Sequence, residues 1–201
     1  MSGLSLNKTA LKGAKDKLAI YSRFLPSLEL KRDQLLVERN GATRRLTDID
    51  RALSELLAAV GEDLPMLANL GIQLDGLARV REVRMGSEQI LGMNLPVLCS
   101  VDIAVAEYGY LTTPHWVDAV MSRLQAAMRL TLSRQVESER LAILERALKR
   151  VNQRVNLFEK VLIPQTRQTV KAIQVGLADA EKAAVVRAKL AKSKRLGCRP
   201  A

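Results

Sequence analysis

Few residues in this chain have a type and spacing that could support catalysis. His115 is the only histidine and stands at the start of a predicted helix, where a surface position is its expected role. Gly71 and Gly76 have the spacing of a phosphate-binding loop. However, Leu77 and Ala78 follow where a lysine and a hydroxyl residue would be needed to hold phosphate and magnesium. Neither His115 nor the Gly71–Gly76 segment is predicted to take part in catalysis.

The thiols and carboxylates do not form a recognisable site either. Cys99 and Cys198 lie far apart, with no CxxC motif or metal-binding spacing, and are expected to be two reduced thiols. Glu145 and Lys149 have the i, i+4 spacing of an ordinary surface pair on a helix. We therefore predict no catalytic residue, no metal, no cofactor and no enzymatic activity of the chain by itself.

Composition predicts long helices. Hydrophobic residues make up 48% and charged residues 26% of the 201 residues, which is typical of a folded chain. Aromatic residues make up only 3%, whereas compact cores usually depend on them for buried area. Their scarcity favours helices that pack along narrow apolar seams.

The net charge of +11 is unevenly distributed. Residues 116–201 carry 18 basic and 7 acidic side chains, whereas residues 61–115 carry 3 basic and 7 acidic ones. A basic arm favours an anionic partner, which could be nucleic acid, lipid or an acidic protein cavity. The longest uncharged run, residues 89–101, is shorter than the roughly 20 residues of a membrane-spanning helix. We therefore expect a cytoplasmic protein that reaches a membrane only through a partner.

Residues 8–60 are predicted to form one long helix with a heptad seam. Thirteen of the fifteen seam positions are apolar, and such a repeat over seven heptads favours a coiled coil. The two exceptions are Arg32 and Arg39, which we expect to meet acidic residues of a facing helix or of another subunit. The seam comprises Leu11, Ala14, Leu18, Tyr21, Leu25, Leu28, Arg32, Leu35, Arg39, Ala42, Leu46, Ile49, Leu53, Leu56 and Val60.

The middle of the chain lacks this period and is punctuated by glycine and proline. Residues 64–78 could hold a short helix. Residues 80–85 and 89–95 are predicted to be two short strands joined by a turn at residues 86–88, and residues 97–106 could add a further strand. A new helix is predicted to start at Thr113-Pro114.

Residues 115–195 are predicted to form a second long helix. Its seam changes rhythm after Leu162, next to Pro164, and such a slip locally unwinds a supercoil. The seam comprises Leu141, Leu144, Leu148, Val151, Val155, Phe158 and Leu162, followed by Thr166, Thr169, Ile173, Leu177, Ala180 and Ala184.

These elements predict a mainly α fold: a long antiparallel two-helix coiled coil with a small α/β head, which contains the hairpin, inserted between the helices. The predicted parts are an N-terminal coiled-coil helix (1–60), the head (61–114) and a C-terminal coiled-coil helix with a basic tail (115–201). Two functions remain open on this pattern, a nucleic-acid-associated coiled coil and a generic coiled-coil adaptor. The first explains the charge but lacks aromatic stacking residues.

Several motifs, in order along nearly the whole chain, resemble the D subunit family of V-type and archaeal-type rotary ATPases. Residues 154–164, Arg-Val-Asn-Leu-Phe-Glu-Lys-Val-Leu-Ile-Pro, are similar to the family's R-V-N-x-L-E-x-V-x-I-P signature, here with Phe158 between Leu157 and Glu159. Residues 30–35, Leu-Lys-Arg-Asp-Gln-Leu, resemble its K-x-K-R-D-x-L motif. Residues 6–11 and 90–96 resemble its opening motif and its hairpin strand, although Lys8 stands where a proline is usual.

The resemblance implies a rotor component of an ATPase or ATP synthase that transports protons or sodium ions. The chain would transmit torque between a catalytic hexamer and a membrane ring. The implied partners are the catalytic and regulatory nucleotide-binding subunits, the small rotor component called the F subunit, and a socket subunit above the ring. No direct insertion into the membrane is implied, and nucleic acid is not expected as a partner.

Ten polar residues are the predicted partner or shaft contacts. Arg32 and Glu159 are also predicted to pair between the helices, on the expectation that residues near 32 and near 156 lie at similar heights. The ten are Lys31, Arg32, Asp33, Arg154, Asn156, Glu159, Lys189, Lys192, Lys194 and Arg195.

Overall fold

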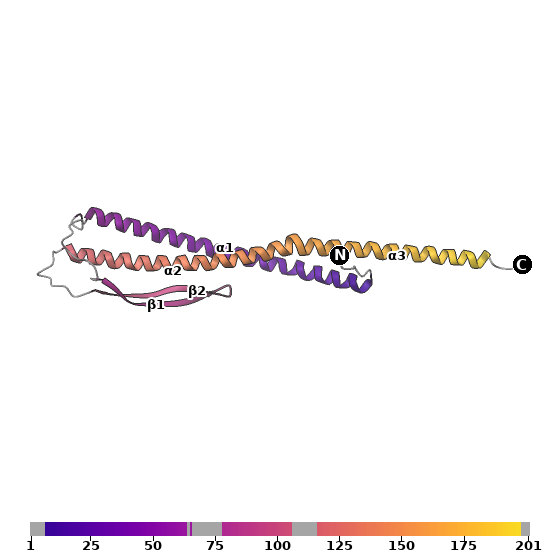
Figure 1. Ribbon diagram of the computed structural model, residues 1–201, viewed down its shortest axis with the longest axis horizontal. Coiled ribbons are helices and arrows are strands. Elements are labelled where there is room, and N and C mark those ends of the chain that lie inside the picture. The colour runs from indigo at the N-terminus through magenta and orange to yellow at the C-terminus, as the bar shows by residue number, and fades with distance from the viewer. Residues whose placement is uncertain (1–6, 64, 66–77, 106–115, 198–201) are drawn as a thin grey trace. The chain divides into compact units, whose positions relative to one another are not determined.

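The computed structural model describes residues 7–63, 65, 78–105 and 116–197 (Figure 1). The elements are α1 (Lys8–Asp63), β1 (Ala78–Ile90), β2 (Met93–Val105), α2 (Trp116–Asn156), the π-helix η2 (Leu157–Leu162) and α3 (Ile163–Gly197). The predicted fold class, long helices with a small hairpin inserted between them, is confirmed. The predicted short helix before β1, the helix start at Thr113-Pro114, and His115 and Cys198 lie outside the described residues.

The chain forms two compact units. The terminal unit contains residues 1–32 and 150–201, and the hairpin unit contains residues 33–149. Each long helical stretch contributes to both units.

Asn7 caps the start of α1. Its side-chain oxygen Oδ1 accepts a hydrogen bond of 2.6 Å from the backbone N–H of Ala10, and its carbonyl accepts one of 3.0 Å from the N–H of Leu11. Asparagine is among the preferred residues at this position because it satisfies a backbone donor that the first turn leaves unpaired. The sequence at residues 7–11 therefore fixes where the helix begins.

The predicted seam of α1 is confirmed. All fifteen seam positions are buried or half-buried, and Leu35 and Ala42 are fully buried. Most residues between the seam positions are exposed. Fully burying one leucine side chain contributes about 2 kcal/mol, so a seam repeated along the helix supplies much of the driving force for pairing.

In the hairpin unit, α1 and α2 run antiparallel. Three ion pairs join them, and the residue number rises along α1 as it falls along α2, so the pairs fix both the direction and the register. They are Arg45 with Glu137 (3.2 Å), Asp50 with Arg134 (2.6 Å) and Asp63 with Arg123 (3.1 Å).

The hairpin turn lies at Leu91-Gly92, so the predicted turn at residues 86–88 is wrong. Gly86 instead pairs with Val97 inside the antiparallel ladder of β1 and β2. Leu91 and Gly92 have φ values of 52° and 77°. A two-residue turn with positive φ at both positions matches the twist of the paired strands, which explains why the strands continue past Gly86.

Two irregularities in the ladder bring Val83 opposite an apolar residue. The register shifts between Val80 and Glu82 and again between Arg84 and Met85. Without the two shifts Val83 would face Ser100, because a slip of one residue moves a side chain to the other face. With them Val83 pairs with Val101, while Val80 with Ile103 and Met85 with Leu98 share one register on either side.

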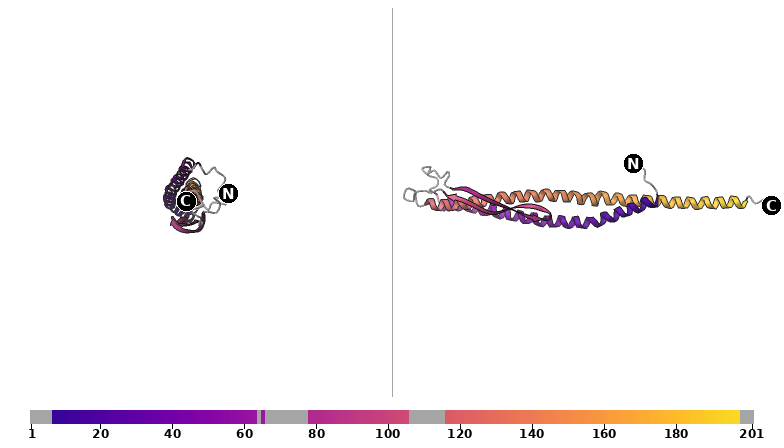
Figure 2. Two further views of the ribbon diagram at one scale, coloured as in Figure 1. Left: turned by 90° about the vertical axis from the view of Figure 1, so that its left-hand side faces the viewer. Right: turned by 90° about the horizontal axis from the view of Figure 1, so that it is seen from below.

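An ion pair attaches the hairpin to α2. Leu95 is fully buried, and the Glu88 carboxylate accepts a 2.7 Å hydrogen bond from Nη2 of Arg140 on α2. Arg140 is the one buried charged residue of the described chain. Figures 1 and 2 show the hairpin lying along α2, as this contact requires.

The predicted unwinding near Leu162 and Pro164 takes the form of the π-helix η2. The N–H of Ile163 donates to the carbonyl of Phe158, five residues earlier. A proline ring clashes with the carbonyl four residues before it in a regular helix, so a wider turn before Pro164 relieves that clash. The Thr166 hydroxyl donates to the Leu162 carbonyl at 2.6 Å and adds a local hydrogen bond at this point.

The second seam is buried or half-buried from Leu141 to Leu177. Ala180 and Ala184 are exposed, so the seam ends earlier than predicted. All residues from 178 to 195 are exposed, and Figure 1 shows α3 running beyond the start of α1 in the terminal unit. A seam without a facing helix has nothing to bury it.

Candidate partner-binding surfaces

The described helices present many exposed side chains. Within the described residues, no group of three or more histidine, cysteine, aspartate or glutamate side chains could hold a metal ion. In the same part of the chain, no helix is both long and apolar enough to cross a lipid bilayer.

Tyr21 and Phe158 set the register of the helices in the terminal unit. Their rings make an edge-to-face contact with centroids 5.5 Å apart and an interplanar angle of 84°. This geometry is a favourable one for aromatic pairs. Residue 21 of α1 therefore lies level with residue 158 of η2.

This register corrects the predicted pairing of Arg32 with Glu159. Arg32 lies eleven residues after Tyr21, or about 16 Å further along α1, while Glu159 directly follows Phe158. The two side chains cannot span that axial separation. Residues near 32 and near 156 therefore lie at different heights, contrary to the expectation from the sequence. The error came from assuming the register, which motif order does not determine.

Among the described residues of this chain no acidic side chain pairs with Arg39, and an acidic partner on another subunit stays a prediction. Its Nη1 donates to the side chain of the neighbouring Asn40 at 3.1 Å, and its Nε is buried without a hydrogen-bond partner. Arg32, the other charged seam residue, is half-buried.

The remaining motif residues are exposed on their helices. Lys31 and Asp33 lie on α1, Arg154 and Asn156 near the end of α2, and Glu159 in η2. The structure thus leaves these polar groups accessible but does not bring them together as one site. Their role as contacts stays a prediction.

The four basic residues of the predicted tail are exposed on the last turns of α3. They are Lys189, Lys192, Lys194 and Arg195.

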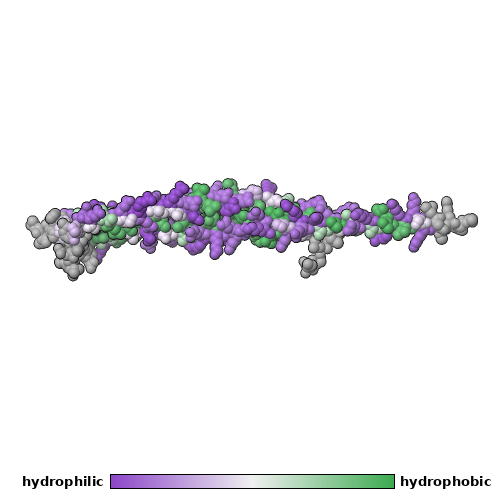
Figure 3. Space-filling view, turned by 90° about the horizontal axis from the view of Figure 1, so that it is seen from above, coloured by the Kyte–Doolittle hydropathy of each residue, from purple (hydrophilic) through white to green (hydrophobic). Residues whose placement is uncertain are grey.

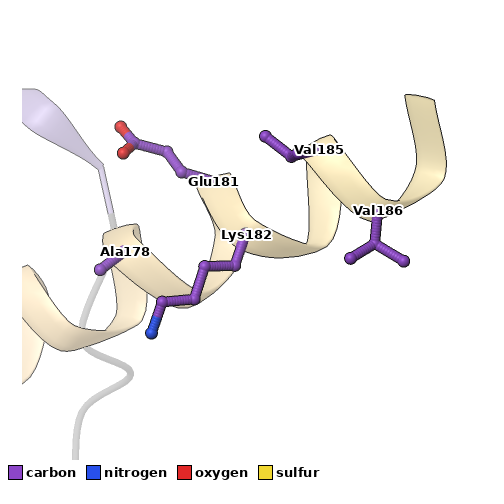
Figure 4. A pocket seen from close by; sticks show the side chains of 5 residues that line it. All are labelled: Ala178, Glu181, Lys182, Val185 and Val186. Carbon is purple, nitrogen blue, oxygen red and sulfur yellow. The ribbon is translucent and has the colours of Figure 1, made fainter. Parts of the chain in front are cut away.

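Apolar residues are exposed on the same helical segment. Val185, Val186 and Leu190 are each more than half exposed, and Figure 3 shows apolar side chains gathered near this end of α3. Val185 and Val186 line a shallow open hollow with Ala178, Glu181 and Lys182, all on one helix (Figure 4). The hollow is open to solvent rather than enclosed.

Sequence reasoning missed two contacts that hold the elements in place. The ring pair of Tyr21 with Phe158 had a signal, because aromatic residues are scarce and both stand at seam positions. The contact of Glu88 with Arg140 had none, because the two residues are 52 positions apart and belong to different kinds of element.

Comparison with known proteins identifies the family of this chain. Residues 10–193 match the family model described as the D subunit of ATP synthase. The chain belongs to the ATP synthase D subunit family. It is 30% identical over 200 residues to the V-type ATP synthase D subunit of Borreliella burgdorferi, covering 96% of this chain and 95% of that one. It is 32% identical over 196 residues to the protein of the same name from Chlamydia felis, covering 96% and 94%.

Family membership makes this chain a central-stalk subunit of a V-type ATPase, a component of that complex. The predicted resemblance is thereby confirmed, and the nucleic-acid-associated and generic-adaptor alternatives are not favoured. The paired helices agree with a stalk built as a coiled coil.

Proposed function

We propose that this chain is the non-catalytic rotor shaft of its complex and transmits torque between the catalytic hexamer and the membrane ring. The observation that carries the proposal is the pair of seams, buried along both helical stretches of a member of the D subunit family. A shaft must resist twisting, and interlocked seam side chains give each unit a packed interior. Ion pairs between α1 and α2 add a fixed register in the hairpin unit.

The proposed partners differ between the two units. The terminal unit, with its exposed α3 segment, would enter the cavity formed by the nucleotide-binding subunits. The hairpin unit would face the small rotor component, the socket subunit and the membrane ring. The chain would be a peripheral protein on the cytoplasmic side of the membrane, held there by the complex.

The basic tail supports the first of these contacts. Exposed lysine and arginine side chains on α3 favour an acidic cavity lining and exchange contacts readily in water. Neutralising Lys189, Lys192, Lys194 and Arg195 together should weaken hexamer assembly at low salt. A control with the same charge change in the hairpin unit is the neutralisation of Arg44, Arg79, Arg81 and Lys149, which are also exposed. Equal assembly of both variants at low and moderate salt would exclude a role for the tail.

Rotation can be tested directly through Cys99. This thiol is exposed on β2, and Cys198→Ser leaves it as the sole cysteine of the chain. A bead attached to Cys99 in the reconstituted complex, with the hexamer fixed to a surface, should rotate when ATP is added. It should stop when hydrolysis is blocked.

A stationary bead on complexes that hydrolyse ATP at the normal rate would overturn the shaft proposal. Failure of the tagged chain to recover two large nucleotide-binding subunits from its native cell would overturn the proposed partners. Rotation together with that recovery supports both.

A further inference from the structure

A cluster of apolar side chains lies exposed on the paired part of the terminal unit. Ile20 is 49% exposed and Phe24 55% on α1, and Leu157 is 46% and Val161 38% on η2. These four residues, the apolar flank, are large enough to be expected inside a fold. Exposed apolar groups that cluster mark interaction sites more often than scattered ones do.

The ring contact places these four residues at one level. Ile20 and Leu157 directly precede the contacting Tyr21 and Phe158 in the chain. Phe24 lies four residues after Ile20 on α1, and Val161 lies four residues after Leu157 on η2. Each spacing is about 6 Å along the helix axis. All four therefore lie within about one helical turn of the ring contact.

The heptad pattern places them on one side of the pair. Tyr21 and Phe158 hold d positions, so Phe24 holds a g position and Ile20 and Leu157 hold c positions. The c and g positions adjoin on one side of a helix. In an antiparallel pair the g side of one helix meets the g side of the other. Val161 follows Leu157 by one turn and so lies on the same side.

The ion pairs of the hairpin unit agree with this assignment of sides. Arg45 at a g position contacts Glu137 at the adjoining d position, whereas Asp50 at an e position contacts Arg134 at the adjoining a position. The same heptad assignment thus predicts which side chains meet in the part of the chain where contacts are observed.

The charges around the apolar flank have one sign. The g positions before and after it hold Lys17 and Lys31 on α1 and Arg154 on α2, all exposed. No acidic residue occupies a c or g position of the paired helices in the described part of the terminal unit, whereas Glu29 and Glu159 hold e positions on the opposite side. The flank is therefore apolar at its centre and basic at its rim.

We propose that the apolar flank is a docking surface for a nucleotide-binding subunit of the hexamer, which presents apolar side chains ringed by carboxylates. This inference rests on the proposed function, because that function places the terminal unit inside the hexamer. The basic rim of the flank favours a partner surface edged by carboxylates, and its exposed apolar area favours apolar side chains at the centre of that surface. The contact lies on one side of the shaft only, so the shaft presents a different face to each subunit around it.

The test compares two double variants in hexamer binding. Phe24→Ser with Leu157→Ser removes the centre of the apolar flank. The matched control, Leu30→Ser with Val175→Ser, replaces apolar residues of the same unit that are 60% and 53% exposed. We expect the flank variant to dissociate from the purified hexamer at least tenfold faster than the wild type. The control should change less than threefold, and both should keep the helical content of the wild type by circular dichroism.

A photo-reactive residue in place of Phe24 identifies what covers the flank. A cross-link to a nucleotide-binding subunit supports the proposal, and a cross-link to the small rotor component or to a second copy of this chain overturns it. Neutralising Lys17, Lys31 and Arg154 should also flatten the salt dependence of binding. An unchanged salt dependence would exclude the acidic rim.

The two proposals fail in different ways. If wild-type chain binds the hexamer and rotates in it but the flank and control variants dissociate equally fast, the docking surface is wrong and the shaft stands. If wild-type chain neither binds nor rotates, the proposed function itself is wrong.

Discussion

The rings of Tyr21 and Phe158 meet edge to face with their centroids 5.5 Å apart. This contact joins the fourth residue in the seam of α1 to the π-helix that interrupts the second helical stretch. It fixes the register of the terminal unit, and through the register it decides which charged residues can and cannot meet.

Removing one ring of this pair should destabilise the protein measurably. Phe158→Ala should lower the free energy of unfolding by about 2 kcal/mol, less than for a fully buried phenylalanine because Phe158 is only half-buried. Thermal unfolding followed by circular dichroism measures the change. Leu30→Ala, at a site 60% exposed, should change stability by less than about 0.5 kcal/mol. Equal effects of the two variants would show that the ring pair does not hold the register.

Charge reversal should distinguish the observed ion pairs from the one expected from the sequence. Arg134→Asp should destabilise by placing a second carboxylate beside Asp50, and adding Asp50→Arg should restore stability. Because both side chains are about half exposed, the coupling should be at most about 1 kcal/mol and should weaken with salt. Arg32→Glu with Glu159→Arg should show no coupling. Denaturant titrations of the two double-mutant cycles measure both coupling energies. Rescue in the cycle of Arg32 and Glu159 would contradict the register set by Tyr21 and Phe158.

The attachment of the hairpin should depend on Glu88. Glu88→Gln leaves the buried Arg140 guanidinium without its charged partner, which should cost about 1–3 kcal/mol and loosen the hairpin from α2. Faster cleavage of residues 78–105 in limited proteolysis measures the loosening. Glu82→Gln is the matched control, because Glu82 pairs with Arg84 of its own strand. Similar cleavage rates for the two variants would show that the Arg140 contact does not hold the hairpin.

Two glycines with equal space around them should respond to alanine in opposite directions. No atom lies within 4 Å of a Cβ built on Gly13 or on Gly92. Gly13 is helical, so Gly13→Ala should stabilise by about 0.5–1 kcal/mol. Gly92 has a φ of +77°, so Gly92→Ala should destabilise by about 1 kcal/mol through backbone strain alone. Calorimetry of both variants tests the turn, and a neutral Gly92→Ala would place the turn elsewhere.

Gly86 should resist substitution for a different reason. A Cβ at this position would lie 2.7 Å from the Sγ of Cys99 on the facing strand. Gly86→Ala should therefore lower the melting temperature, and adding Cys99→Ala should recover much of the loss because it removes the clashing sulfur. If the second change recovers nothing, the strand pairing at Gly86 differs from the one described.

The sequence alone determined the two long helices, their seams and the position of the distortion near Pro164. Heptad spacing is local information: each seam residue is identified by its neighbours three and four positions away, and burial in the structure follows those positions up to Leu177. The motifs also led to the correct family, because they lie in order along nearly the whole chain. The predicted hairpin was in the right region, with its turn misplaced by about four residues.

Only the tertiary structure decided the register and the contacts that depend on it. A heptad repeat looks the same after a shift of seven residues, so the seams could not place Phe158 beside Tyr21 rather than beside another seam residue. The same ambiguity produced the mistaken pairing of Arg32 with Glu159. The hairpin contact with Arg140 and the exposed apolar flank likewise arise from residues far apart in the chain, and only the folded structure brings those residues together.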